Sequence, residues 1–380
     1  MRHTRGVACL VVAVALAAAA APHYRGMRPG DLIVAGPGVT AARYLSDWLP
    51  AIAGGPVDTP VYVLEGAAPG GTVLVLGGTH GDEAAGYLAA VVLVEQARVR
   101  TGRLIVLPRA NASGFTHNVG QEAHPQAFFI STPAGPRRFT YGARATNPVH
   151  QWPDPQVYVH AASGQALSGS ETRNLNRAYP GRADGTLTER LALAITTLAS
   201  RERVDLAIDL HEASPEYPVV NTMVAHQRAM DLAALANVAL QEQDIAIGLE
   251  ASPESLHGLS HREWGDATPA FAVLAETTNP AQGRLRGRTD AALVTAGRDR
   301  FYVVAGERGR LSVPFPLGGW PIDVRVARHL ATVRELIATL TMLGPDRPVE
   351  VDGVPSYADL LAGGVGRYLS PPRDQKGTSP

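Results

Sequence analysis

Two short stretches of this chain carry side chains whose types and spacing could bind a metal ion. His80 and Glu83 lie three residues apart, in the turn after the apolar run Val73–Leu76. His211 follows a second apolar run that begins at Val204. Imidazole nitrogens and carboxylate oxygens are ligands of Zn²⁺, and a catalytic zinc has three protein ligands and one open position. The spacing therefore predicts a catalytic metal site held by His80, Glu83 and His211.

A third apolar run ends close to another acidic residue. Phe271–Leu274 is followed by Glu276, so Glu276, His80 and His211 each come just after an expected strand. Ligands of open α/β sheets bind outside the carboxyl ends of the strands. A His-x-x-Glu pair alone also fits an ordinary surface turn, but three strand ends that supply polar groups favour a site. A carboxylate there can move protons between water and a leaving amine.

The elements around these residues follow from the apolar pattern. Strands are expected at 61–64, 72–76 and 104–107, with a buried helix at 84–97 between the last two. Strand, helix and strand of these lengths form a βαβ unit, which predicts parallel pairing in an α/β sheet. Further helices are expected at 41–51, 186–201, 227–244 and 323–343, and further strands at 204–210, 218–225, 271–274 and 301–304.

The composition is that of a globular protein with ample core material. Apolar residues make up 45% of the chain and charged residues 18%. A net charge of −1 leaves no broad basic face, so we expect no nucleic-acid partner. The only cysteine is Cys9, in a segment that we expect to be removed. Any metal site in the mature chain must therefore use histidine and carboxylate ligands.

Residues 1–21 differ in kind from the rest. A basic start with Arg2 and Arg5 is followed by an apolar run of small residues from Val7 to Ala21, as in a secretory signal peptide. The run is shorter than the roughly 20 residues of a membrane helix. An uncleaved N-terminal anchor is the alternative, and only then do we expect membrane contact. Both alternatives predict an exported domain, periplasmic or secreted.

The long segment 111–185 has little periodicity and many polar and aromatic residues. Long loops in compact domains are usually functional or disordered, and the aromatic content argues against disorder. We expect it to form the wall and rim of a pocket, although a surface insertion is the alternative. At the other end, Ser370–Pro380 is polar with three prolines and is expected to be disordered.

Four motifs together resemble the M14 zinc carboxypeptidase superfamily, in the branch of succinylglutamate desuccinylase and aspartoacylase. The motifs are Gly78-Thr-His-Gly-Asp-Glu83, Arg173-Asn-Leu-Asn-Arg-Ala-Tyr-Pro-Gly181, Ile208-Asp-Leu-His-Glu212 and, more loosely, Leu274-Ala-Glu-Thr-Thr278. The resemblance implies a mixed, largely parallel α/β sheet with helices on both faces and one catalytic zinc per chain. It covers roughly residues 60–345. We therefore expect a single catalytic domain at 23–345 and a C-terminal extension at 346–380.

The resemblance also implies roles by position. His80, Glu83 and His211 match the metal ligands, and Glu276 matches the general acid/base. Asn176 and Arg177 match the pair that grips a substrate carboxylate, for which the planar guanidinium is suited.

The family arginine that polarises the scissile carbonyl has no clear match in this sequence. Arg173 and Arg144 are the candidates, with Arg137 and Arg138 behind them. We assign Arg173 to the catalytic role and place Arg144 with Asn176 and Arg177 among the substrate-binding residues. Asp209 and Glu212 flank His211 and are candidates for orienting a metal ligand. The cluster His257, His261 and Glu263 is expected to be a lid or rim, and a second metal site is the alternative.

These expectations lead to two functional hypotheses. The first is a zinc hydrolase that cleaves an amide bond next to a free carboxylate, in an N-acyl amino acid, a peptide C-terminus or a cell-wall peptide. The second is a zinc-containing envelope protein that binds peptides or acyl ligands without hydrolysing them. Glu276 favours the first hypothesis, since a binding protein needs no base at that place.

Overall fold

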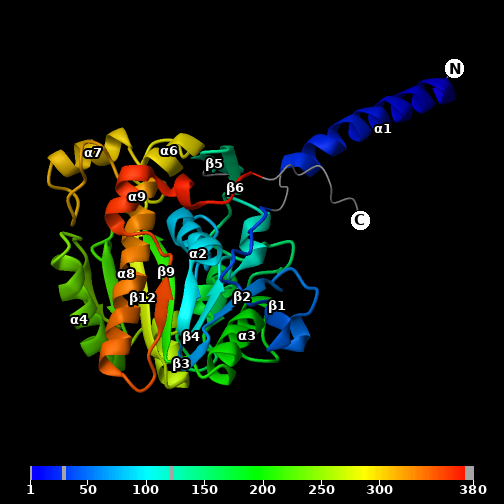
Figure 1. Ribbon diagram of the computed structural model, residues 1–380. Helices are drawn as coiled ribbons and strands as arrows, with labels where there is room; N and C mark the ends of the chain where they lie inside the picture. The colour runs from blue at the N-terminus through cyan, green and yellow to red at the C-terminus, as the bar shows by residue number, and fades with distance from the viewer. Residues whose placement is uncertain (1, 28–30, 120–123, 373–380) are drawn as a thin grey trace. The chain divides into compact units, whose positions relative to one another are not determined.

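A nine-stranded mixed sheet forms the centre of the fold in the computed structural model, which describes residues 2–27, 31–119 and 124–372 (Figure 1). Its central strands are parallel: β3 pairs with β4 and β9, and β9 pairs with β12. Antiparallel pairs flank this centre on both sides. In spatial order the strands are β1 (Ala41–Tyr44), β2 (Pro60–Glu65), β4 (Arg98–Leu107), β3 (Ala68–Leu76), β9 (Leu206–Ala213), β12 (Phe271–Thr278), β10 (Thr222–Ala225) and β11 (Gly248–Ala251), with β13 (Glu350–Asp352) paired to β4.

Helices cover both faces of this sheet, because successive side chains of a strand point to opposite faces. Val73 and Val75 of β3 belong to the core beneath α2 (Ala84–Gln96), α4 (Met230–Gln241) and α8 (Ile322–Leu343). Leu74 and Leu76 belong to the core beneath α3 (Leu187–Arg201) and α5 (Ser260–Ala267). Burial on both faces explains the continuous apolar runs of the central strands. The predicted fold class, a mixed and largely parallel α/β sheet with helices on both faces, is confirmed.

Two of the expected elements were wrong. The helix expected at 41–51 is instead the edge strand β1, which pairs with β2, followed by 3-10 turns at Leu45–Asp47 and Pro50–Ile52. The strand expected at 301–304 lies inside α7 (Arg300–Glu307). Asp299 caps that helix by accepting from the amides of Phe301 and Tyr302. This N-cap residue indicates the start of a helix, but the apolar pattern of the residues after it predicts a strand. The strand expected at 218–225 begins only at Thr222.

The segment 111–185 contains two small hairpins and several 3-10 turns, so it is not structureless. The hairpins are β5 (Ala127–Thr132) with β6 (Gly135–Thr140), and β7 (Val157–Val159) with β8 (Ala166–Ser168). Phe139 of β6 packs edge-on against Tyr87 of α2, with ring centroids 5.9 Å apart. The aromatic residues thus connect this segment to α2, whose N-cap residue is Glu83.

Residues after 345 join the same core. The short helix α9 (Tyr357–Gly363) contributes Leu360, and the following turn and chain contribute Val365 and Leu369. α6 (Ala291–Ala296) also packs on this side of the unit. Of the tail that we expected to be disordered, residues 373–380 lie outside the described part of the chain.

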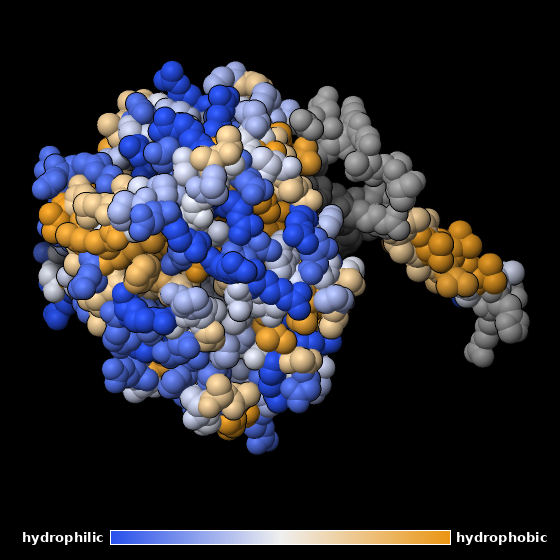
Figure 2. All heavy atoms as spheres, turned by 60° about the horizontal axis from the view of Figure 1, so that its bottom comes forward, coloured by the Kyte–Doolittle hydropathy of each residue, from blue (hydrophilic) through white to orange (hydrophobic). Residues whose placement is uncertain are grey.

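The chain divides into two units, Met1–Leu32 and Ile33–Pro380. The first contains one helix, α1 (Arg2–Met27), which Figure 2 colours largely as hydrophobic. Its exposed large apolar side chains include those of Val7, Leu10, Val11, Val12, Val14 and Leu16. Within the residues that the structure describes, we find no helix with the length and apolar character needed to cross a membrane.

Candidate metal centre and active site

The turn between β3 and α2 presents His80 and Glu83 on the same side. Gly78 has φ +64°, a left-handed conformation that favours glycine, and Phe115 lies against it. The amide of Glu83 then donates to the carbonyl of His80 at 3.3 Å, which closes the turn. Glu83 is the N-cap residue of α2, yet its side chain makes no cap bond. Its carboxylate is directed instead at two imidazole rings.

His211 lies within β9, two residues before its end, and not beyond the strand as expected. Glu276 is its direct partner across the parallel pair of β9 and β12. Residues that pair in register have side chains on the same face of a sheet. Register therefore places Glu276 beside His211.

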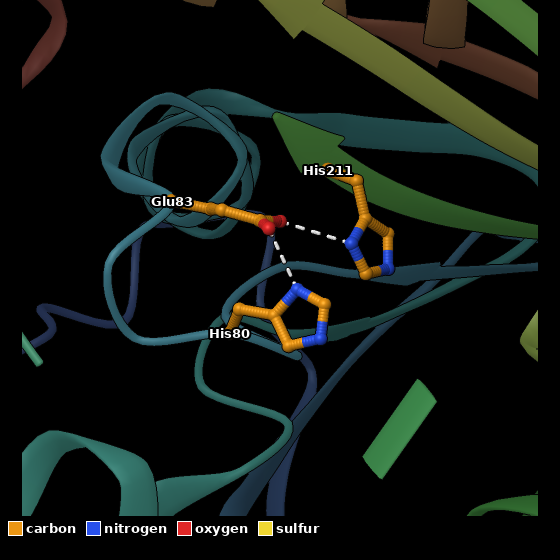
Figure 3. A group of neighbouring side chains, drawn as sticks. All are labelled: His80, Glu83 and His211. Atoms are coloured by element: carbon orange, nitrogen blue, oxygen red, sulfur yellow. Dashed lines mark hydrogen bonds and ion pairs between the residues drawn. The ribbon is translucent and has the colours of Figure 1, made fainter. Parts of the chain in front are cut away.

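Three side chains converge on one point, as Figure 3 shows. Nδ1 of His80 lies 2.6 Å from Oε1 of Glu83, and Nδ1 of His211 lies 2.9 Å from Oε2 of Glu83. Ligand atoms of all three lie within 4.8 Å of one another, and all three residues are buried. Two imidazole nitrogens and a carboxylate form a donor set of the catalytic zinc type. The residues therefore fit a metal ion.

Outer contacts orient both rings for such a role. Asn174 donates its Nδ2 to Glu171, so its Oδ1 faces His80 Nε2 at 2.9 Å. His211 Nε2 forms a buried ion pair with Asp209 Oδ2 at 2.8 Å. Each ring thus turns Nε2 to an acceptor and Nδ1 to the common point, as ring partners of metal-binding histidines do. Sequence reasoning missed Asn174, although it stands inside the Arg173–Gly181 motif.

The electrostatics of the three residues differ. Burial, followed by the charge of Arg144, lowers the pKa of His80 to about 4, so its ring is neutral. Burial also acts to lower the pKa of His211, but Asp209 and Glu83 outweigh it and hold that pKa well above its usual range. Burial acts to raise the pKa of Glu83, whereas His80 and His211 pull it well below its usual range. Metal binding would therefore displace a proton from His211.

Glu276 has the character of a proton-transfer group. The residue is partly exposed, while its Oε2 is buried and makes no hydrogen bond to the described residues. Burial raises the pKa of Glu276 to about 8, with His211 opposing the rise and Glu83 adding to it. A carboxylate whose pKa is close to the working pH can both accept and return a proton.

The structure separates the two candidate arginines. Arg144 reaches the site: its Nη1 lies 3.3 Å from His80 Nδ1 and 3.5 Å from Glu83 Oε1, and its side chain is 43% exposed. Arg173 forms a two-pronged pair with Asp154, at 2.7 and 2.9 Å, and donates to the carbonyl of Thr146. These bonds occupy Nε, Nη1 and Nη2 of Arg173. Its geometry is that of a structural residue, which speaks against the catalytic role expected for it and favours Arg144. Arg137 is likewise held in a buried pair with Glu95.

Asn176 and Arg177 lie beside the same site. Asn176 is buried, and its Oδ1 accepts from the amide of Ser260 at the start of α5. Arg177 is 22% exposed in its side chain, and its Nε lies 3.9 Å from Glu171. Burial lowers the pKa of Arg177, and the neighbouring charge of Arg144 lowers it further. Two cationic side chains thus stand close together near the converging ligands.

The second polar cluster does not assemble a metal site. His257 Nδ1 pairs with Glu263 at 3.0 Å, but His261 Nδ1 faces Ser252 at 2.8 Å instead. Among the described residues, His80, Glu83 and His211 form the only group of three or more potential ligands that converge.

Part of the chain is similar to a known catalytic domain. Residues 158–273 match the model of the succinylglutamate desuccinylase/aspartoacylase catalytic domain. This segment holds Asn176, Arg177 and His211 and ends three residues before Glu276. A curated relative, the N-alpha-acetyl-L-2,4-diaminobutyric acid deacetylase of Halomonas elongata, is 26% identical over 174 residues, which cover 45% of this chain and 37% of the relative.

Solved structures are also similar to this chain, at lower sequence identity than the curated relative. A succinylglutamate desuccinylase from Silicibacter sp. TM1040 has a TM-score of 0.37 at 22% identity, covering 58% of this chain and 53% of that chain. The cell shape determinant protein Csd4 from Helicobacter pylori has a TM-score of 0.42 at 13% identity, covering 80% of this chain and 58% of that one. The matches thus span less than two thirds of each of these proteins. Residues 158–273 are thus similar to the succinylglutamate desuccinylase/aspartoacylase catalytic domain, a similarity that supports an M14-like superfamily for this chain.

Proposed function

We propose that this protein is a zinc-dependent hydrolase that cleaves an amide bond next to a free carboxylate. The substrate would be an N-acyl amino acid or a short peptide, including a cell-wall peptide. The convergence of His80, Glu83 and His211, with Glu276 in register beside His211, is the observation that carries the proposal. The matched catalytic-domain segment and the deacetylase relative support it.

In this proposal the chain supplies three functions around the scissile bond. A zinc ion held by His80, Glu83 and His211 would act as a Lewis acid toward water and carbonyl oxygen. Glu276 takes a proton from the attacking water and gives it to the leaving nitrogen, while a C–O bond forms and the C–N bond breaks. Arg144 stabilises the negative charge that develops on the carbonyl oxygen.

Arg177 and Asn176 would bind the substrate carboxylate. The guanidinium of Arg177 can meet a carboxylate with two parallel hydrogen bonds, which lysine cannot do. Its 3.9 Å distance from Glu171 is too long for a tight pair, so a substrate carboxylate can compete for it. This arrangement supports a requirement for a free carboxylate next to the cleaved amide.

The test is to measure zinc content and turnover in the wild type and in the variant Glu276→Gln. We expect about one zinc per chain in both proteins. We expect turnover of acyl amino acids or short peptides to fall at least about 10²-fold in the variant, because the proton carrier is lost. A variant with full activity would disprove the mechanism, and a wild type without zinc would disprove the metal site.

We also propose that the domain is exported, because residues 1–21 combine a basic start with a short apolar run. Sequencing the N-terminus of the chain recovered from the source cells tests this. A chain that starts close to residue 21 supports export with cleavage, whereas a full-length chain found in the cytoplasm contradicts it.

A further inference from the structure

A fully enclosed ion pair lies next to the metal site. Nη1 of Arg325 in α8 is 2.6 Å from Oε1 of Glu212 in β9, and neither side chain is exposed. Arg325 also donates to the backbone carbonyl of Val294 in α6. Replacing a buried ion pair by apolar residues of similar volume is often neutral or even stabilising, so such a pair is weak evidence for stability. The remaining contacts of Glu212 indicate another role.

Both further bonds of Glu212 go to the segment that carries Glu83. Oε2 of Glu212 accepts from the amide of Ala85 at 2.8 Å, and the amide of Glu212 donates to Oε2 of Glu83 at 3.0 Å. Because alternate side chains of a strand point to opposite faces, Glu212 points away from the face of Asp209 and His211. We had considered Glu212 as a partner that orients His211. Its contacts lie instead with the other half of the metal site.

These contacts supply a hydrogen-bond acceptor that the first turn of α2 would otherwise lack. The first amides of a helix lack partners within the helix, and the N-cap side chain usually accepts from one of them. Glu83 occupies the N-cap position, but its carboxylate faces His80 and His211. Glu212 supplies the missing acceptor from a different element. A carboxylate at a helix N-terminus is also favoured by the helix dipole.

We propose that the Arg325–Glu212 pair is a positioning device that leaves Glu83 free to bind the metal. Arg325 fixes the carboxylate of Glu212, Glu212 caps α2 in place of Glu83, and α2 then holds Glu83 at the correct place relative to His211. The inference rests on the proposed function, because it assigns a role toward the metal that the site would bind.

The test compares zinc affinity, measured by competition with a chelator, in the wild type and the double variant Glu212→Met/Arg325→Met. Removing both charges leaves no unpaired buried charge, so the variant should fold. We expect its zinc dissociation constant to rise about 10–100-fold, as for other losses of outer contacts at metal sites. Hydrogen exchange at the Ala85 amide should also become faster without any metal present, because that amide has lost its acceptor.

A matched control exists at the other end of the same helix. Glu95 of α2 and Arg137 form a buried pair with an Nη2–Oε1 distance of 2.7 Å. In Glu95→Met/Arg137→Met we expect zinc affinity within about twofold of the wild type, since this pair lies three helical turns from Glu83. Equal loss of affinity in both double variants would mean that general stability is responsible and would overturn the inference.

Other outcomes also decide for or against the inference. Zinc affinity within twofold of the wild type in a folded Glu212→Met/Arg325→Met variant would overturn the inference and leave the proposed function intact. A wild type that binds no zinc would overturn both. If the double variant does not fold, Arg325→Lys is measured, which keeps the charge but loses the planar fork. Weaker zinc binding at unchanged circular dichroism in that variant would support the inference, and unchanged binding would refute it.

Discussion

At the scale of single residues, the two arginines that the sequence left open should separate by experiment. Arg144 is half exposed and touches the ligand residues, whereas Arg173 is locked by Asp154. We expect Arg144→Ala to lower kcat by about 10²–10³-fold, as for the loss of one donor to a developing oxyanion. Its melting temperature should change little, because Arg144 is half exposed and makes no close pair.

Arg173→Ala is the matched comparison. It leaves the carboxylate of Asp154 without its partner, at a site where both side chains are about 15% exposed. We expect a lower melting temperature and, in protein that remains folded, a kcat within a few-fold of the wild type. Kinetics and thermal melts of both variants check this. The reverse pattern, with Arg173 needed for kcat and Arg144 for stability, would show that the roles are exchanged.

At the scale of elements, the close approach of α2 to β9 sets the distance between Glu83 and His211. A Cβ on Gly86 would lie 2.3 Å from the carbonyl oxygen of Leu210, so a side chain there must push the helix away from the strand. We expect Gly86→Ala to destabilise the protein by about 1–3 kcal/mol, in the range of overpacked cores. We also expect at least tenfold weaker zinc binding, because Glu83 moves with the helix.

The control for this prediction is Ala89→Gly in the same helix. It lowers helix stability by roughly 1 kcal/mol without forcing α2 away from β9. Urea unfolding and chelator competition on both variants separate the two effects. Zinc affinity that falls equally in Ala89→Gly would argue for helix stability and against the spacing of α2 and β9.

At the scale of the whole molecule, buried neutral histidines should make the fold sensitive to acid. Burial lowers the pKa of His329 to about 3, and it lowers that of His261 to about 3 as well. The usual histidine pKa is about 6.5, so below that pH the unfolded chain takes up protons that the folded chain refuses. Stability should therefore be complete above pH 6.5 and fall between pH 6.5 and 3, with each histidine contributing up to about 1.4 kcal/mol per pH unit.

The variant His329→Gln tests this dependence. His329 lies on α8, with Nε2 3.2 Å from the hydroxyl of Thr277 in β12, and glutamine can keep that contact without titrating. Urea unfolding from pH 7 to 4, with chelator present, should show a slope smaller by about one proton. Leu330→Ala, a buried neighbour on the same helix, should lower stability at every pH and keep the slope. An unchanged slope in His329→Gln would refute the prediction.

Much of the fold and the meeting of the three metal-binding residues could be predicted from sequence. The central strands are buried on both faces and so appear as uninterrupted apolar runs, and the βαβ pattern requires their carboxyl ends to lie at one edge. His80, His211 and Glu276 stand at the ends of such runs, so the sequence predicts that they lie at the same edge of the sheet. Edge elements such as β1 lack this signal, because one strand partner and not burial decides their conformation.

Only the tertiary structure decided which polar side chains meet across long stretches of sequence. Arg144 reaches His80 from 64 residues away, and Arg325 reaches Glu212 from 113 residues away. Such contacts depend on loop conformation and helix placement, which local patterns of one sequence do not encode. The residue types and their spacing determined which side chains can bind a metal ion and transfer protons. The packing of α2, α8 and the loop around Arg144 determined which other side chains contact these residues.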